Sequence, residues 1–532
     1  MRKKPNHTKV AAPHPSEKGQ GSRLASRWLA PALFFVLAWL WASWWMGDLL
    51  RITYEQSFFA ANATLMHWLW QQPFGSLWIL GRALLTLYHW PLVGGLVVAL
   101  LLTAGSWLVG YCLRLPLRWR WIQYLPASAW MTWVAWLGLN LYFQSEPGRI
   151  FGALLLGVLV CAVDAFIIWT FKKPLSHGAA IPLPSRKEQF LKLLFILACF
   201  ALPLSVTHLR HPYVRPLSRM QVQLLHQDWQ GMVGTAHENA SLSYRPLAAF
   251  YAIALVHTGH LADQLFDIRL EFDSLYLMNR NRTSDVGSEL YTIDGDYHAG
   301  LFRAATHKAM EHLTMQGPTL FSLKHLSKLA LLNGDWSLAR KYLKIIGESP
   351  FESAFVEKYD NMLENPERVE ADPEFAVVRK TEPLEDSFEG QYQQPTFLGY
   401  TAVLTQGRSQ EALIQSLMAN LYSKRMPDFL YRCQPFVGRT PPTTIVEGLI
   451  TQSIKNQAIL QAFPISQREL QRYQAFLRVV APYMKNRAAA PVELFEQYRG
   501  YYPYYYFFGN LRVTRKRDDA EASKSNAGVN SE

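Results

Sequence analysis

The architecture is decided by residues 190–207, FLKLLFILACFALPLSVT, the last strongly apolar segment of the chain. It is close to the shortest helix that crosses about 30 Å of hydrocarbon. Lys192 can extend its ammonium group to the interface, and neighbouring helices can satisfy the carbonyl that Pro203 leaves without a donor. The alternative is a core helix of a soluble domain, which is disfavoured because four similar segments precede it. We predict the last membrane span here.

Upstream of this segment the chain contains further apolar segments. Residues 1–27 are polar and basic, which predicts a disordered tail, and Trp28–Leu50 is long enough for a retained signal anchor. Arg82 and Pro91 divide the next apolar region, so we expect an interfacial or partly re-entrant helix at Ser76–His89. Three more spans are expected at about 90–113, 124–143 and 150–171.

The basic residues between the spans predict their orientation. With the N-terminal tail in the cytoplasm, the basic loops at 114–120 and 172–187 are cytoplasmic too, and these segments carry more Lys and Arg than those assigned outside. Five spans then place the C-terminal half in the periplasm, outside the inner membrane of a bacterium. Counting Ser76–His89 as a span would reverse this orientation.

The composition excludes several classes of function. The chain has 532 residues, which predicts more than one domain, and a formal net charge of +12. Much of that charge falls in the tail and in short loops, where it sets topology, and no nucleic-acid-binding motif accompanies it. The cysteines lack zinc or CxxC spacing and are interpreted as small buried hydrophobes, so we expect no metal or cofactor. They are Cys112, Cys161, Cys199 and Cys433.

Downstream of the last span the apolar residues follow a helical period, and convincing strands are almost absent. The clearest unit is residues 326–351, LSKLALLNGDWSLARKYLKIIGESPF. It has Gly-Asp at a turn and small and aromatic residues on the apolar face of the following helix, as a tetratricopeptide helix–turn–helix unit requires. The residues of this pattern are Gly334, Asp335, Trp336, Ala339 and Tyr342.

Weaker copies of the pattern occur on both sides of this unit. Trp229 in HQDWQGMVGTA stands at a matching turn, Gly259 in ALVHTGHLADQLF follows, and LTQGRSQEALIQSLMANLY continues the series. Their irregular spacing predicts degenerate repeats, with a plain helical bundle as the alternative. We expect a long loop at Glu364–Gln394, and an aromatic run at Tyr501–Phe508 that packs on the last lobe or touches the membrane.

The predicted fold class is therefore all-α. A transmembrane helix bundle of about five spans at 28–208 follows the tail at 1–27. A soluble, degenerate TPR-like helical repeat domain occupies 209–512, and a disordered tail occupies 513–532.

Two charged residues of the membrane module are candidate intramembrane polar residues. Asp164 is the clear carboxylate within a predicted span, where such groups are costly and often functional. We favour a local helix–helix hydrogen bond or an interfacial position for it. Arg82 is the second candidate.

No motif in the soluble half supports catalysis. His307, Glu311 and His312 do not form a zinc-protease pattern, and we interpret them as a solvated helix face. Asp294-Gly295-Asp296 lacks the later ligand of a calcium loop, which predicts a turn. Nucleotide-binding and hydrolase motifs are absent as well, so the sequence favours a protein that is not an enzyme.

Four stretches resemble, in order and spacing, an uncharacterised family of bacterial membrane proteins. They are PFGSLWILGRALLTLYHWPLVGG, GHLADQLFDIRL, DYHAGLFRAATHKAMEHL and LALLNGDWSLARKYLKII. The resemblance covers most of residues 28–510 and implies a membrane module followed by tetratricopeptide-like helices. The chain departs from the family at Phe74-Gly75, where a double glycine is more common. The resemblance implies architecture and no activity.

The leading hypothesis is an integral membrane protein that presents a helical-repeat scaffold outside the cytoplasmic membrane. Its partners would be envelope or membrane proteins bound by the repeats, and the lipid bilayer. An alternative is an accessory or enzyme component of envelope-polymer or lipid-linked substrate assembly or transport, motivated by Asp164 and Arg82. A third is a structural membrane protein whose soluble half packs on the bilayer.

Overall fold

A computed structural model describes residues 18–143, 146–171, 186–270, 288–384, 409–487 and 489–509. These residues are 79% helical and form no strands, which confirms the all-α prediction. The predicted C-terminal tail and most of the predicted N-terminal tail lie outside the described residues.

The chain forms two compact units and passes between them repeatedly. Unit 1 comprises Met1–Gly47, Trp90–Gly138 and Ile150–His211. Unit 2 comprises Asp48–His89, Leu139–Arg149 and Pro212–Glu532. This division differs from the predicted boundary at 208, because two segments that connect predicted spans belong to the same compact unit as the C-terminal half.

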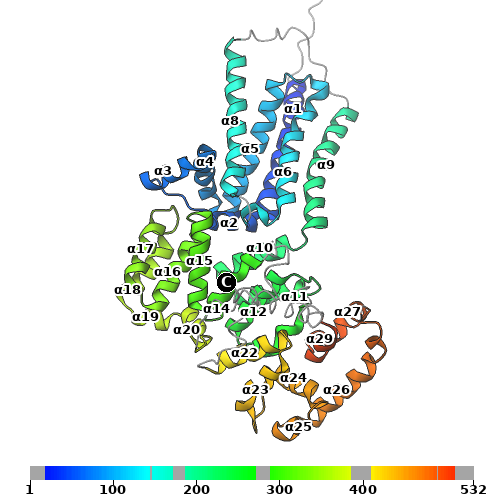
Figure 1. Ribbon diagram of the computed structural model, residues 1–532. Coiled ribbons are helices and arrows are strands. Elements are labelled where there is room, and N and C mark those ends of the chain that lie inside the picture. Colours follow the sequence, from blue (N-terminus) through cyan, green and yellow to red (C-terminus); the bar gives the residue numbers. More distant parts are fainter. Residues whose placement is uncertain are drawn as a thin grey trace, which may run out of the picture. The chain divides into compact units, whose positions relative to one another are not determined.

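Unit 1 contains four helices that are long and apolar enough to cross a membrane. These are the stretches Trp28–Trp45, Pro91–Cys112, Pro147–Phe171 and Phe190–Arg210. They belong to α1 (Lys18–Leu40) with the π-helical turn η1 (Trp41–Trp45), α5 (Pro91–Cys112), α8 (Pro147–Phe171) and α9 (Arg186–Arg210), all labelled in Figure 1 except η1.

Two predicted spans have different limits. The first was predicted to reach Leu50, but its helix stops at Trp45, and α2 (Gly47–Glu55) begins a new element. The range predicted as a span, 124–143, contains α6 (Leu125–Leu137), which is shorter than predicted and is not among the four candidate membrane helices. It ends where Gly138 adopts a φ of 55° that other residues rarely reach. The 3₁₀ helix η3 (Leu117–Tyr124) leads directly into α6.

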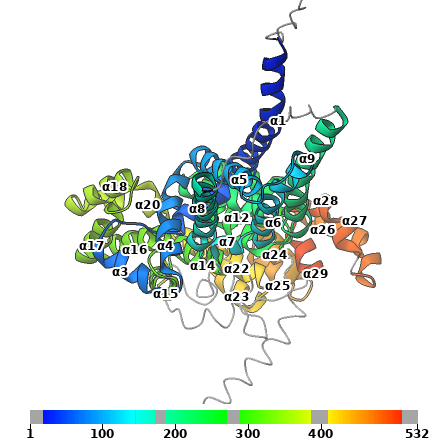
Figure 2. The same cartoon turned by 90° about the horizontal axis from the view of Figure 1, so that it is seen from above.

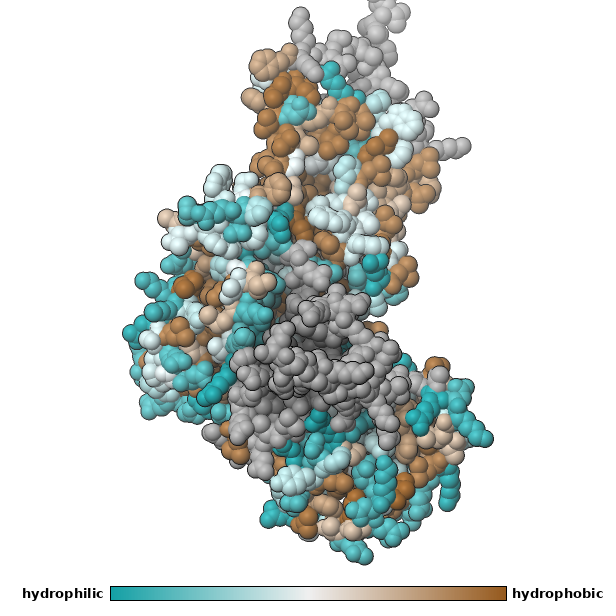
Figure 3. Space-filling model, viewed as in Figure 1, coloured by the Kyte–Doolittle hydropathy of each residue, from teal (hydrophilic) through white to brown (hydrophobic). Residues whose placement is uncertain are grey.

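The helices of unit 1 bury one side and expose apolar residues on the other. A Cβ on Gly95 of α5 would overlap Ser43, and Phe34 packs on Tyr124 and Phe200. The outward side chains of α8 include Phe166, Trp169 and Phe171. Figure 3 shows this predominantly apolar surface in brown over unit 1. Such a continuous apolar surface fits contact with lipid.

Unit 2 is built from helices in which neighbours along the chain pack on one another (Figures 1 and 2). The first part contains α10 (Val214–Leu225), α11 (Trp229–Glu238), α12 (Arg245–Thr258), α14 (Ser288–His298), α15 (Phe302–Gln316), α16 (Leu320–Asn333), α17 (Trp336–Gly347), α18 (Ser353–Glu364), α19 (Glu367–Ala371) and α20 (Pro373–Lys380). The second part contains α22 (Gln410–Tyr422), α23 (Met426–Arg432), α24 (Thr443–Ser453), α26 (Gln467–Val480), α27 (Ala490–Glu493) and α29 (Tyr502–Phe508).

Four of the turns between helices share one backbone conformation, and we call them the repeat turns. In each, a left-handed residue is followed by a residue with φ between −81° and −87° and ψ between 63° and 73°, after which the next helix begins. The N–H of the second residue donates to the carbonyl five positions earlier at 2.8–2.9 Å. The repeat turns are Gln227-Asp228, Gly300-Leu301, Gly334-Asp335 and Lys424-Arg425.

The positions after each repeat turn are buried alike. The fifth residue after the left-handed one is Met232, Ala305, Ala339 or Phe429, and each is fully buried. The ninth is Ala236, Ala309, Leu343 or Cys433, and each is at most 1% exposed. The four helix pairs therefore use the same face of their second helix for packing.

The structure contradicts two predictions for the C-terminal half and agrees with a third. The loop predicted at Glu364–Gln394 is wrong over its first half, because α19 and α20 lie there. The turn predicted at Asp294–Asp296 is wrong because α14 continues through it to His298. Of the two expectations for the aromatic run at Tyr501–Phe508, packing on its own lobe is the one observed. The hydroxyl of Tyr505 donates to the carbonyl of Tyr422 at 2.8 Å.

The segment between the first two candidate spans is helical and belongs to unit 2. It contains α2, α3 (Ala63–Gln71), α4 (Gly75–Leu85) and the 3₁₀ helix η2 (Thr86–His89). The helix predicted at Ser76–His89 is confirmed as α4 and η2. Helices α3 and α4 pack on each other as a hairpin, and they lie side by side in Figures 1 and 2.

Candidate functional site

A group of buried polar contacts joins α2 to α16. Tyr54 and Glu55 end α2, and Lys324 lies in the second turn of α16. The Lys324 ammonium contacts Glu55 at 2.8 Å and Glu352 at 2.9 Å, while the Tyr54 hydroxyl donates to Glu352 at 2.6 Å. Two buried carboxylates from distant parts of the sequence therefore share one lysine.

A rim of partly exposed groups continues this arrangement. Arg51, one turn before Glu55 on α2, pairs with it at 2.9 Å and donates to the backbone carbonyl of His89 at 2.9 Å. The imidazole of His89 packs against Phe351, a non-glycine residue with φ of 71°. We refer to Arg51, Tyr54, Glu55, His89, Lys324 and Glu352 as the Lys324 network.

The two carboxyls of the network differ electrostatically. Burial favours the neutral acid at Glu55, but Lys324 and Arg51 outweigh it and lower its pKa. Burial raises the pKa of Glu352 above its ordinary value, since Lys324 only partly offsets it and the charge of Glu55 opposes ionisation. Burial and Arg51 lower the pKa of His89 to about 4, which keeps that ring neutral at pH 7.

A second contact fixes the same segment through Arg82 of α4. Its fully buried guanidinium donates to Glu146 at 3.0 and 3.3 Å and to the carbonyls of Phe58 at 3.3 Å and Pro318 at 3.1 Å. It also lies over the ring of Trp78, 5.1 Å from the ring centre. Arg82 thus ties together all three segments of unit 2, and α4 is not among the candidate membrane helices.

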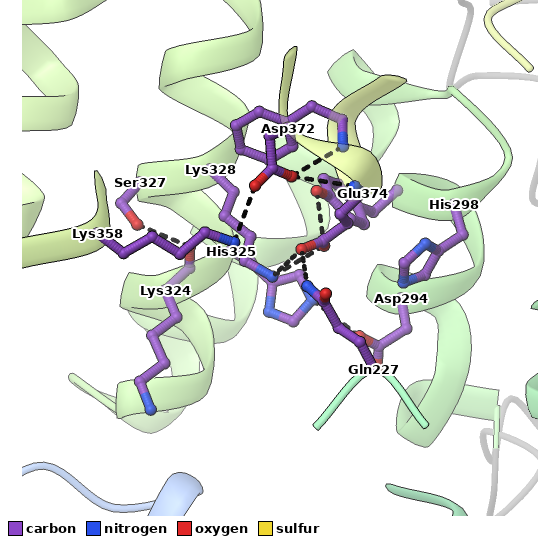
Figure 4. Close-up of polar contacts among 12 residues, drawn as sticks. Gln227, Asp294, His298, Lys324, His325, Ser327, Lys328, Lys358, Asp372 and Glu374 are labelled. Atoms are coloured by element: carbon purple, nitrogen blue, oxygen red, sulfur yellow. Dashed lines mark hydrogen bonds and ion pairs between the residues drawn. The ribbon is translucent and has the colours of Figure 1, made fainter. Parts of the chain in front are cut away.

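One turn further along α16, Lys328 lies at the centre of a second cluster, shown in Figure 4. Glu374 of α20 accepts from Lys328 at 2.9 and 3.1 Å, from the Tyr297 hydroxyl at 2.9 Å and from Gln227 at 2.7 Å. Beside it, Asp372 pairs with Lys358 at 2.9 Å and caps α20. We call these six residues the Glu374 cluster.

The Glu374 cluster holds its charges by mutual pairing. Burial alone would raise the pKa of Glu374, but Lys328 and the hydrogen bonds reverse this and lower it. Next to it, His298 is buried against His257, with ring nitrogens 2.9 Å apart, and burial lowers the pKa of both rings, that of His257 to about 4. Both imidazoles are therefore neutral at pH 7, and one must donate to the other.

The ion pairs and hydrogen bonds of both clusters hold helices of unit 2 together. Each carboxylate has a cation or hydroxyl partner within 3 Å, and removing one partner from such a pair strands a buried charge. Within the described ranges no three His, Cys, Asp or Glu residues are grouped so that they could hold a metal ion. The clusters connect helices that are far apart in sequence and set the arrangement of unit 2.

The sequence-predicted residues fall into separate places. Asp164 lies on α8 in unit 1 with an exposed side chain, and it belongs to neither cluster. His307 and Glu311 lie exposed on α15, as predicted, but His312 is half-buried and contacts the Ser322 hydroxyl at 2.6 Å.

The residues predicted to form repeat units lie at helix ends and on the helices that follow them. Gly334 adopts φ of 76° as the helix ends, Trp336 opens α17, and Ala339 is fully buried. Gly259 also ends its helix in the left-handed conformation, but the residue after it has a ψ of 15°, so it is not a repeat turn. These residues shape the fold of unit 2 and do not belong to either polar cluster.

Sequence reasoning missed both clusters. One signal was present: Lys324 and Lys328 stand four apart, so they share a face of a helix in which most of the other residues are apolar. Lysines on an apolar helix indicate buried carboxylate partners. Which carboxylates these are could not be read from the sequence, because Glu55 is 269 residues away from Lys324.

Comparison with known proteins gives one match. A family model described as "Family of unknown function (DUF6057)" matches residues 154–509. Neither the curated proteins nor the solved structures contain a match to the chain.

Proposed function

The chain belongs to the family of unknown function DUF6057, and we propose that it is an inner-membrane protein whose repeat domain binds other proteins outside the cytoplasm. The proposal has three parts: five membrane spans, a periplasmic unit 2, and a tetratricopeptide-like surface in that unit. The repeat turns are the observation that carries it.

The three chain segments that make up unit 2 support the five spans. Asp48–His89, Leu139–Arg149 and Pro212 onward share one compact unit, so they must lie on one side of a membrane. An even number of crossings therefore separates each from the next. The chain between 89 and 139 contains α5 and α6, and the chain between 149 and 212 contains α8 and α9. With α1, this makes five.

Helix α6 is the short member of this set. Its 13 residues rise only about 20 Å. Residues 121–124, the part of the contiguous 3₁₀ helix η3 that follows Arg120, add about 2 Å each, so together with α6 they come close to the thickness of the hydrocarbon. Five crossings and basic cytoplasmic loops support a periplasmic position for unit 2.

The repeat turns support tetratricopeptide-like architecture. The separation of Gly300 and Gly334 equals the 34-residue length of such a repeat. Between them the chain forms α15 and α16, so α14–α15 and α16–α17 are two successive helix pairs. The remaining repeat turns have other spacings, which is what degenerate repeats with insertions give.

Stacked helix pairs present long surfaces to partners. The polar inner contacts of α16 are already occupied by Glu55 and Glu374, which leaves the outer face of α17 for binding. Two large apolar side chains lie seven positions apart on one face of that helix and are exposed: Leu338 by 37% and Ile345 by 38%. An envelope protein with an apolar helix or peptide would fit this face.

The compartment is tested by fusing alkaline phosphatase and, separately, green fluorescent protein after Leu217 and after Asn510. Phosphatase activity without fluorescence at both sites is expected. Fluorescence without phosphatase activity would overturn the periplasmic assignment.

Partner binding is tested in the intact chain with a photo-crosslinking amino acid at Leu338. We expect a crosslinked envelope protein, and the same product should disappear when Ile345→Asp is added. A crosslinker at the exposed Val492 is the matched control. Absence of any product at positions 338 and 345 would exclude this face as the binding surface.

A further inference from the structure

The α3–α4 hairpin has an uncharged, aromatic tip. From Ala63 through Gly81 the sequence contains no Asp, Glu, Lys or Arg. Two large aromatic side chains are nevertheless exposed at the turn of the hairpin, Trp70 by 67% and Phe74 by 76%. A water-facing hairpin of a soluble domain would carry charges at such positions.

The turn itself presents Phe74 outward. Phe74 has φ of 60° and ψ of 43°, a left-handed conformation that is an outlier for a bulky residue. Behind it, a Cβ on Gly75 would overlap the backbone of Leu69 and Trp70, so the two helices meet closely. A strained backbone that holds an aromatic ring away from the protein indicates that the ring has a functional contact outside it.

The base of the hairpin is fixed where the chain enters candidate spans. A Cβ on Gly81 would overlap the backbone of Gly148 in the first turn of α8, and Trp78 lies 5.3 Å from the Arg149 guanidinium. At its other end, α4 continues through η2 to His89, and α5 begins at Pro91. The hairpin therefore contacts the start of α8 and is joined through η2 to α5, and both of these helices are long enough to span a membrane.

We propose that the α3–α4 hairpin is a lipid-binding element whose tip, Trp70 and Phe74, inserts into the outer interface of the bilayer. Aromatic side chains concentrate at this depth because the ring is apolar and its rim tolerates water. The absence of charge favours insertion into lipid over a protein partner, whose interface would have a polar rim. Binding by this hairpin does not depend on anionic lipid.

The test uses the full chain in lipid nanodiscs. The four native cysteines are replaced, and a bimane fluorophore is attached to Phe74→Cys or, in a variant that leaves the turn intact, Trp70→Cys. Val160→Cys on α8 (59% exposed) is the lipid reference, and Val492→Cys on α27 (81% exposed) is the water reference. Quenching by brominated lipid and by aqueous iodide is then measured for each site.

Insertion predicts that bimane at 70 and 74 is quenched by brominated lipid, with blue-shifted emission relative to position 492, in zwitterionic as in anionic nanodiscs. Quenching by iodide alone would overturn the proposal by placing the tip in water. Quenching by neither would overturn it by placing the tip against protein. The proposal rests on the proposed spans, and position 160 separates the two: if its label also escapes lipid quenching, the spans fail and not only the hairpin.

Discussion

At the scale of single residues, Lys324 is the most informative side chain. It is the cation that Glu55 and Glu352 share, and both carboxylates are at most 4% exposed. Replacing it by Met keeps an apolar stem against Phe355 but leaves two acids with one cation, Arg51, between them.

We expect Lys324→Met to lower the free energy of unfolding by about 3 kcal/mol, the lower end for breaking a buried ion pair. Thermal unfolding of the purified protein in detergent measures the change. Lys344→Met, on the exposed side of α17, is the control and should leave the midpoint unchanged. Equal midpoints for both variants would show that the network contributes nothing to stability.

We predict that the stability of the fold depends on pH through the carboxyl group of Glu447. Burial raises its pKa to about 7, although the N–H of Tyr502 at 2.9 Å and Arg472 at 3.1 Å favour the ionised form. A carboxyl whose pKa is higher in the folded state than in the unfolded state stabilises the fold at low pH and loses that effect as the pH rises.

Relative to Glu447→Gln, the wild type should therefore lose up to about 3 kcal/mol of stability between pH 4.5 and pH 7. Because other acids titrate in the same range, the measurement is the difference between wild type and variant in urea unfolding at pH 5 and at pH 8. A difference that does not vary with pH would contradict the assigned ionisation.

At the scale of elements, the repeat turns make the conformational requirement of Gly334 testable. Nothing lies within 4 Å of a Cβ built on it, so the cost of Gly334→Ala is that of the left-handed backbone alone, about 1 kcal/mol. Gly234, inside α11, also has nothing within 4 Å of a built Cβ. Gly234→Ala should instead stabilise, by up to about 1 kcal/mol. Chemical denaturation of both variants measures these changes, and effects of the same sign would contradict the account.

Most elements could be predicted from local sequence, and the failures have local reasons. The helix that begins at Trp336 follows from Gly-Asp before an apolar period. The turn predicted at Asp294–Asp296 failed because Asp-Gly-Asp is ordinarily a turn signal, whereas here Asp294 pairs with His325 and Asp296 with Lys308 inside a continuous helix. Tertiary pairing outweighed the local preference.

The candidate site was less predictable than the fold. Hydropathy locates α8 and α9 because a span is defined by its own residues. The partners of Lys324 and Arg82 come from other segments of unit 2, and a single sequence carries no record of which segments meet. That Asp48–His89 joins the C-terminal half follows from Tyr54, Glu55 and Arg82. The first two resembled ordinary residues of a polar connection, and Arg82 was interpreted as an intramembrane charge.

At the scale of the whole molecule, we predict that the protein can be produced as two fragments that bind each other, because unit 2 is built from separate segments of the chain. Residues 212–532 alone lack Tyr54, Glu55 and Arg82, so we expect them to be less stable than the intact protein. Producing residues 1–211 and 212–532 as two chains should give a complex that purifies together through a tag on either one. Lys324→Met should weaken that complex, and Lys344→Met should not. Independent purification of two folded halves would contradict the composite unit.

The origin of unit 2 from three separated segments also constrains how the protein is made. Asp48–His89 leaves the ribosome long before α16 and α20 do, on the order of tens of seconds earlier at ordinary rates of synthesis. During that interval Glu55 lacks its later partner Lys324, and Arg82 lacks the carbonyl of Pro318. A newly made chain is thus most vulnerable to proteases in Asp48–His89 until α16 has been made and has packed on that segment.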